Sequence, residues 1–391
     1  MTETVPVRAS ATYQNRVAAA ALIAVAAAGI AVLGALLSAG DRASTCGSDF
    51  LNFYTGGKLA FSGNIYSPGA EARIQSQLMG CGPSWEQFCR LPYFAGLLWP
   101  FAQLPFAAAL AVWRCICVAA VLVFIWMWPG PRPVTLAVCG WSFPLMVAFA
   151  YGQDVPILLL AAGAGIALLG TRRDFAAGLC LAMGAAKPHL FVILVLVILV
   201  RRRWRAVAGL AAGGFVLAAG CFLAGGFRWP LDFWRTVRGP AGSPRPSTMI
   251  NLHGAILALR APWWMEAALA IAFLALIVWA CSQVPLQPGL ALALAGGVLL
   301  GGHSYLYDLV FLIPLLLTVL SWPGVARWLK WTAAFSASPV LYLTPISIPS
   351  PGLAHFLLPV FLILTSLAIY LARGRCMRLA LRQRTARAGD G

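Results

Sequence analysis

Long runs of apolar residues, free of charged side chains, alternate along the chain with short polar turns. Three such runs cover residues 17–40, 133–153 and 206–227. A helix that crosses a bilayer needs about 20 apolar residues, because the hydrocarbon core is about 30 Å thick. Two longer runs, 267–302 and 331–372, each contain a proline-bearing turn that divides them into two helices. The pattern therefore predicts an all-α polytopic membrane protein.

The polar turns divide the apolar sequence into twelve expected helices, with boundaries that can err by about 2–4 residues. They cover residues 17–38, 104–128, 134–150, 153–170, 174–186, 188–200, 206–226, 263–281, 289–302, 306–320, 327–345 and 353–372. The short pair 174–186 and 188–200 could instead form a re-entrant hairpin, which is stable only where protein covers it. A segment near Leu91–Phe101 could also enter the membrane partly. We expect a bundle of about 10–12 transmembrane helices, with interfacial helices in the first outer loop.

Composition agrees with a lipid environment. Hydrophobic residues make up 61% of the chain and charged residues 10%, whereas soluble domains average about 45–50% and about 25%. A net charge of +17 would suggest nucleic acid as the partner of a soluble protein. Here the basic residues lie at expected helix ends, where the positive-inside rule places them. Membrane lipids, and no nucleic acid, are therefore the expected partners.

Arginine is distributed unevenly between the two sides of the expected bundle. Twelve spans place both termini on one side, and most short-loop cations lie there: Arg132, Arg172, Arg173, Arg201, Arg202, Arg203, Arg205, Arg327 and Lys330. The positive-inside rule then puts residues 1–16 and the basic tail 373–391 in the cytoplasm. We expect residues 17–372 to form one transmembrane domain of the cell inner (plasma) membrane. Its two long outer loops, 41–103 and 227–262, are then expected on the extracytoplasmic side.

Cysteines give little information about the chemistry. Cys46, Cys81 and Cys89 share the first outer loop, where a disulfide is possible. Three cysteines cannot all pair with one another, and no Cys-x₂-Cys spacing indicates zinc. The cysteines therefore indicate no metal site, and we expect no cofactor.

The few polar residues near expected helix ends gather on the outer side. Asp49 follows the first helix, and the others lie at outer turns or in the second outer loop: Gln153, Asp154, Lys187, His189, Arg235, His253, His303 and Asp308. A charge at membrane depth costs about 2.5–3.5 kcal/mol on insertion scales, and charges kept there usually serve a site. Independent structural roles would not place so many of them on one side. We therefore predict one outward-facing polar cavity.

Each of these residues also has a simpler structural interpretation. Asp49 could only cap an interfacial helix that begins there, and Asp154 could cap the helix that follows it. Lys187 could be a snorkelling lysine at a helix end, and His303 a neutral hydrogen-bonding group between helices. Tyr305 could belong to the aromatic belt at the membrane surface.

Four short stretches resemble glycosyltransferase family 87, the membrane-embedded C-type glycosyltransferases that include polyprenyl-phosphate-mannose-dependent α-1,2-mannosyltransferases. They are Asp49-Phe50-Leu51-Asn52-Phe53-Tyr54 with its continuation to Tyr66, Tyr151-Gly152-Gln153, Lys187-Pro188-His189, and His303-Ser304-Tyr305-Leu306-Tyr307-Asp308. The likeness spans residues 17 to about 320. Each motif is short, so the resemblance rests on the order of the four motifs and on their lying on the same expected side of the membrane. His189 departs from the pattern, because glutamine is commoner there.

The resemblance implies a C-type glycosyltransferase-like fold and a sugar donor carried on polyprenyl phosphate. Such an enzyme moves a sugar, here expected to be mannose-like, to an extracytoplasmic glycan or glycolipid acceptor with inversion. Asp49 would be the general base, with His303 assisting, and Lys187, His189 and Arg235 would face the donor phosphate. The cavity would be lined by Tyr54, Gln153, Asp154, His253, Tyr305 and Asp308. No nucleotide diphosphate is expected, and the chain has no metal-binding Asp-x-Asp motif.

A multi-pass transporter or flippase is the main alternative. Transporters tend to keep polar residues at the membrane midplane, at broken helices, and often have repeated halves. Here the polar residues lie at outer turns and no internal repeat is visible. A polymerase or ligase of lipid-linked glycans is a third interpretation, and a purely structural membrane protein is the least favoured.

The arginine asymmetry predicts that the C-terminus faces the cytoplasm. A C-terminal green fluorescent protein fusion should fluoresce, and a C-terminal alkaline phosphatase fusion should be inactive, because the phosphatase matures only outside the cytoplasm. An active phosphatase fusion would overturn the topology and, with it, the argument for one outer cavity.

Overall fold

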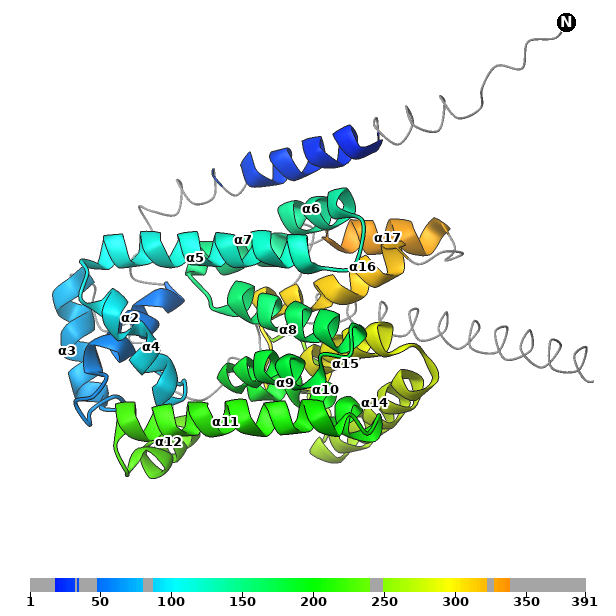
Figure 1. Cartoon of the computed structure of the whole chain (residues 1–391). Helices are drawn as coiled ribbons and strands as arrows, with labels where there is room; N and C mark the ends of the chain where they lie inside the picture. Colours follow the sequence, from blue (N-terminus) through cyan, green and yellow to red (C-terminus); the bar gives the residue numbers. More distant parts are fainter. Residues whose placement is uncertain are drawn as a thin grey trace, which may run out of the picture.

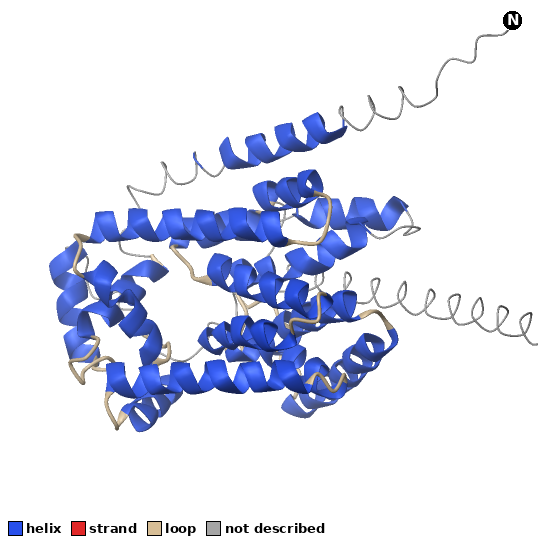
Figure 2. Ribbon diagram, in the orientation of Figure 1, coloured by secondary structure: helices blue, strands red, loops and turns tan. Residues whose placement is uncertain are grey.

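The computed structural model describes residues 18–31, 34, 48–79, 87–239, 249–321 and 327–337, and within these residues the regular elements are all helices (Figure 2). A helix at Ala18–Ala31 is followed by α2 (Asp49–Leu59), α3 (Pro68–Met79) and α4 (Pro92–Ala102). The middle of the chain forms α5 (Phe106–Met127), α6 (Arg132–Trp141), α7 (Phe143–Tyr151), α8 (Val155–Gly170), α9 (Asp174–Ala182), η1 (Met183–Ala186), α10 (Pro188–Val200) and α11 (Trp204–Gly225). The remaining helices are α12 (Trp229–Arg238), α13 (Leu252–Ala258), α14 (Trp263–Gln283), α15 (Leu286–Leu300), η4 (Leu306–Leu312), α16 (Ile313–Ser321) and α17 (Arg327–Ala337).

The helices confirm an all-α polytopic membrane protein. Among the described residues, α5, α11 and α14 are long and apolar enough to cross a membrane, and the bent pair α6–α7 would make a fourth span. Shorter apolar helices include α8, α10 and α15. The segment 41–103, predicted to be the first outer loop, contains the helices α2, α3 and α4. The expected helix at 353–372 lies outside the described residues.

Three of the expected helices are not continuous α-helices in the structure. The helix expected at 134–150 is two helices, α6 and α7, bent by 58° around Ser142. Pro144 explains the break, because its ring would clash with the carbonyl four residues earlier and its nitrogen has no hydrogen to donate. The helix expected at 174–186 ends in the 3₁₀ turn η1, and the one expected at 306–320 begins as η4.

The core is a stack of helices with the first outer loop at one end. The helices α5, α8, α9 and α11 pack in that order, and α10 packs against α15 (Figure 1). The helices α2 and α4 pack together, and α4 also contacts the far end of α11. Since the first outer loop lies against the ends of α5 and α11, residues near position 50 can meet turns between later helices.

Small residues allow the closest helix contacts. A side chain added at Gly178 on α9 would overlap the carbonyl oxygen of Ala206, and one added at Gly209 on α11 would overlap that of Phe175. Without a hydrophobic driving force between helices in lipid, such close backbone approach is a main source of association. The α9–α11 contact therefore depends on glycine at both positions.

This contact predicts that Gly209→Val destabilises the protein while Gly214→Val on the same helix does not. A side chain at Gly214 would meet open space. Both substitutions change helix propensity equally, so a difference in stability between the two variants reports packing. Overpacking typically costs about 1–3 kcal/mol. Thermal unfolding in detergent, followed by size-exclusion fluorescence, should show a lower melting temperature for Gly209→Val alone. Equal melting temperatures would contradict the close contact.

Candidate functional site

The site begins at the first residue of α2. The N-cap of this helix is Ser48, whose hydroxyl accepts a hydrogen bond from the Phe50 N–H and donates one to the Tyr151 carbonyl at 3.2 Å. The interpretation of Asp49 as the cap is therefore wrong. Ser48 supplies the cap, and the partly buried Asp49 carboxylate is left for another role.

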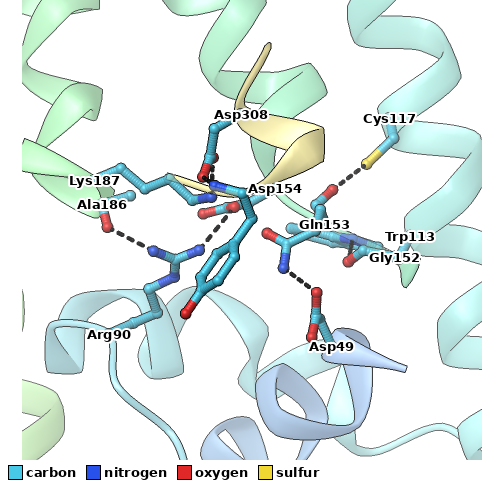
Figure 3. A network of polar contacts seen from close by, with 11 residues as sticks. Asp49, Arg90, Trp113, Cys117, Gly152, Gln153, Asp154, Ala186, Lys187 and Asp308 are labelled. Carbon is cyan, nitrogen blue, oxygen red and sulfur yellow. Dashed lines mark hydrogen bonds and ion pairs between the residues drawn. The ribbon is translucent and has the colours of Figure 1, made fainter. Parts of the chain in front are cut away.

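The turn at Gly152 and Gln153 orients Asp49. Gly152 ends α7 with φ of +68°, a left-handed conformation that favours glycine, and a Cβ there would also crowd Phe50. The Trp113 indole N–H donates to the Gly152 carbonyl at 2.9 Å, which holds the turn in place. The Gln153 side-chain amide then donates to the Asp49 carboxylate (Figure 3). Two stretches about 100 residues apart in the chain thus meet at one carboxylate.

Asp154, the next residue, forms an ion pair with Arg90. The Arg90 Nη2 lies 3.0 Å from Asp154 Oδ1, and its Nη1 donates to the Ala186 carbonyl at 3.1 Å (Figure 3). Asp154 occupies the N-cap position of α8 but makes no side-chain hydrogen bond to that helix. The capping interpretation of Asp154 is therefore wrong.

Arg90 is not among the site residues that the sequence predicts. It has no basic residue beside it, and its sequence context does not distinguish it from Arg73 in the same loop. No local signal could have found it, because its importance comes from a partner on a distant helix.

The segment that carries Arg90 is held at two further points. The Tyr66 hydroxyl donates to the Arg90 carbonyl at 2.7 Å, and the Phe88 N–H donates to Glu71 Oε2 at 2.9 Å. Glu71 is almost fully buried, and burial raises the pKa of its carboxyl to about 8. Glu71 is therefore mostly protonated at neutral pH. These contacts fix the backbone from which the Arg90 side chain extends.

Lys187 forms a second buried ion pair, with Asp308. Its Nζ lies 2.6 Å from Asp308 Oδ1, and the two side chains are 4% and 1% exposed. The other Asp308 oxygen accepts the Tyr305 N–H at 2.9 Å, so the carboxylate also fixes the start of η4. Lys187 Nζ lies 4.6 Å from the centroid of the Tyr307 ring. A snorkelling lysine would extend toward water, so that interpretation is wrong.

Two histidines stack beside this pair. The ring centroids of His189 and His303 are 4.1 Å apart, at an interplanar angle of 37°. Burial lowers the pKa of the His303 imidazole, and the charges of Lys187 and Arg90 act in the same direction while Asp308 opposes them. His303 is therefore neutral at neutral pH.

Asn251 supports the loop that carries His303. Its side-chain amide donates to the Gly301 carbonyl at 2.5 Å, and the Ile250 N–H donates to the Ser304 carbonyl at 3.0 Å. Asn251 is likewise not among the predicted site residues, because an asparagine in a long loop is an ordinary turn residue.

Eight of the predicted residues thus belong to one continuous set of neighbours, which we call the contact chain. Its members are Asp49, Gln153, Asp154, Arg90, Lys187, Asp308, Tyr305, His303 and His189. Three buried polar atoms within it, Gln153 Oε1, Asp154 Oδ2 and His189 Nε2, have no hydrogen-bond partner. Buried polar atoms are nearly always satisfied, so these three are candidates for contacts with a bound substrate.

Three other predicted residues have different surroundings. The Tyr54 hydroxyl donates to the Leu104 carbonyl at 2.7 Å, and its buried ring packs against Phe106. His253 Nδ1 lies 2.8 Å from a carboxylate oxygen of Glu266 on α14. Arg235 lies 3.6 Å from Asp232 on α12, with its side chain 62% exposed. None of the three makes a described contact with the contact chain.

Comparison with known proteins gives one match. A family model for glycosyltransferase family 87 matches residues 92–306, more than half of the chain. No curated protein and no solved structure matches. The matched range includes Gln153, Lys187 and His303, while Asp49 and Arg90 precede it. The match favours an enzyme over a transporter, and the chain belongs to glycosyltransferase family 87, a family of membrane glycosyltransferases.

Proposed function

We propose that the protein transfers a mannose-like sugar from a polyprenyl-phosphate donor to an extracytoplasmic glycan or glycolipid, with inversion. The observation that carries this proposal is the contact chain, in which one partly exposed carboxylate lies in the same set of neighbours as the buried Lys187 and the largely buried Arg90. Inverting transfer needs a base beside the acceptor hydroxyl and positive charge beside the departing phosphate.

Asp49 is the proposed general base. Its carboxylate accepts the proton of the acceptor hydroxyl while that oxygen attacks the anomeric carbon of the donor. The bond between this carbon and the phosphate oxygen breaks, and the phosphate leaves with the electron pair. The Gln153 amide supports this role because it donates to the carboxylate and orients it. His303, neutral at neutral pH, is the proposed assisting group.

Lys187 and Arg90 are the proposed contacts of the departing phosphate. An ammonium has three N–H donors and a guanidinium has five. Asp308 takes one from Lys187, and Asp154 and Ala186 take two from Arg90. The remaining donors suit phosphate oxygens, and Arg90, at 13% exposure, is the more accessible of the two cations. Arg90 thus takes the role that the sequence suggested for Arg235. The unpartnered Nε2 of His189 supports a neighbouring contact with the phosphate or the sugar.

The role of Asp49 predicts that Asp49→Asn strongly slows transfer without unfolding the protein. An asparagine retains the shape and can still bond to Gln153, and the helix cap comes from Ser48. It cannot accept a proton, so the rate should fall by about 10²-fold or more, the usual scale for a lost general base. The assay follows radiolabelled sugar from polyprenyl-phosphate donors onto membrane acceptors.

Asp174→Asn is the matched control, because Asp174 pairs with Arg203 outside the contact chain. It should retain activity. A fully active Asp49→Asn variant would move the base elsewhere. A wild type inactive with every polyprenyl-phosphate sugar would overturn the proposed function itself.

The buried Lys187–Asp308 pair allows structural and catalytic roles to be separated. Lys187→Met alone leaves Asp308 buried without its partner, which should cost about 3–5 kcal/mol of stability. The double variant Lys187→Met/Asp308→Asn removes both charges while keeping an oxygen for the Tyr305 N–H. Its melting temperature should recover, but its transfer rate should stay about 10²–10³-fold low, as for a lost electrostatic contact to the transition state. Wild-type turnover in a folded double variant would show that Lys187 is only structural.

A further inference from the structure

A cavity of about 700 Å³ lies between the first and second outer loops. Its wall comes from the segment between α2 and α3, the end of α11 and one face of α12, which lie at the same end of the molecule (Figure 1). The polar side chains that line it include Asn64, Tyr66, Gln87, Arg228, Asp232 and Arg235. Ligand pockets commonly have volumes of about 300–1,000 Å³, so the cavity is large enough for a ligand.

The lining of this cavity mixes hydrogen-bond donors with acceptors. The amides of Asn64 and Gln87 offer both, whereas Arg235 only donates and Asp232 only accepts. Arg235 Nη1 lies 3.6 Å from Asp232 Oδ1, which offsets part of its charge. An ionised phosphate only accepts hydrogen bonds, so it could bond to Arg228 and Arg235 but would be repelled by Asp232 and would leave the acceptor groups of the lining unused. Sugar hydroxyls both donate and accept, so the lining suits a carbohydrate better than a phosphate.

Exposed apolar side chains occur on the segments that form the cavity wall. Phe227 lines it and is 90% exposed, and Leu223, one helical turn earlier on α11, is 76% exposed. On α12, Leu231 and Trp234 are 47% and 53% exposed. An apolar helix face beside basic residues is typical of a segment that lies in the membrane interface. A ligand with a polar head and an apolar tail would place its head in the cavity and its tail in the lipid.

One wall of the cavity is shared with the contact chain. Gln87 donates to the Tyr66 carbonyl at 3.4 Å, and the Tyr66 hydroxyl donates to the Arg90 carbonyl. The Arg90 side chain extends to Asp154 in the contact chain. The segment from Gln87 to Arg90 therefore borders the cavity at one end and the proposed reaction site at the other.

We propose that this cavity binds the carbohydrate head group of a membrane-borne glycolipid, the acceptor of the transfer. The proposal rests on the proposed function and assigns a place to its second substrate. Asn64, Asp232 and Arg235 bond to hydroxyl groups of the head group, while the lipid tail passes Phe227 into the bilayer. Arg235 then belongs to acceptor binding and not to the donor phosphate.

Photo-crosslinking tests this assignment without requiring turnover. The probes are decyl α-mannoside, decyl β-glucoside and decyl β-galactoside, each with a diazirine on the first alkyl carbon, added to the full-length protein in lipid nanodiscs. At least one should label peptides from residues 63–68 or 225–239, and the parent decyl glycoside should compete. Labelling of other segments only, or no labelling by any probe, overturns the site.

Variants on α12 give the matched comparison. Arg235→Gln should weaken labelling by roughly tenfold or more, the scale of a lost hydrogen bond to a charged group. Arg238→Gln should not change it, because Arg238 stacks on Trp234 at 4.1 Å and does not line the cavity. Equal labelling of the two variants would remove Arg235 from the site.

Two kinds of competitor identify the ligand class. Decyl phosphate should compete poorly, and strong competition by it alone would assign the cavity to the donor phosphate. Methyl α-mannoside, methyl β-glucoside and methyl β-galactoside carry the same sugars without the tail. Any of them competing as well as its decyl glycoside would replace the glycolipid with a soluble glycan and overturn the proposal. Because labelling needs no catalysis, a labelled but inactive wild type would count against the proposed function and leave the cavity assignment standing.

Discussion

Two pairs of opposite charges are buried among helices from distant parts of the chain, and the arrangement of the site depends on them. Arg90 meets Asp154, and Lys187 meets Asp308, across 64 and 121 residues of sequence. A buried charge without its partner costs several kcal/mol, so each pair forms only when both of the segments that carry it are in place. The first outer loop, the start of α8, the start of α10 and η4 are thereby held in one arrangement. Asp49 gains its position from the same arrangement, through Gln153.

Much of the fold could be predicted because lipid imposes a simple rule on sequence. Spanning segments must be apolar and must satisfy their own backbone hydrogen bonds. The expected helices at 104–128, 206–226 and 263–281 therefore correspond closely to α5, α11 and α14. The break at Ser142 escaped prediction because apolar content continues through it, and the bend comes from Pro144. Proline inside an apolar run can be tolerated in a membrane helix, so its presence alone does not decide between a kink and a break.

The site could be predicted in part, for a related reason. Charges are rare in this chain, so those near helix ends stood out as candidates, and Asp49, Lys187 and Asp308 occur in the contact chain. The pairing of acids with bases could not be predicted, because it depends on helix packing. The hydrophobic pattern of the sequence does not encode that packing. Arg90 shows the limit clearly. It lies in a loop where arginine is unremarkable, and only the position of α8 gives it a partner. Arg235 was selected by the same criterion, as a cation expected on the outer side, but it lines the separate cavity and makes no described contact with the contact chain.

The balance of charge in the contact chain bears on what the site can recognise. Arg90 and Lys187 are matched by Asp154 and Asp308, so the four groups have no net charge, and Asp49 adds a negative one. A site of this kind would bind a multiply charged nucleotide diphosphate poorly. A lipid-linked phosphodiester has a single negative charge in the ground state, and a second develops on the phosphate only as the sugar leaves. Preformed ion pairs that still have N–H donors to offer stabilise the charge that develops as the sugar leaves more than the charge present in the ground state. Catalysis requires such a difference in stabilisation between the transition state and the ground state.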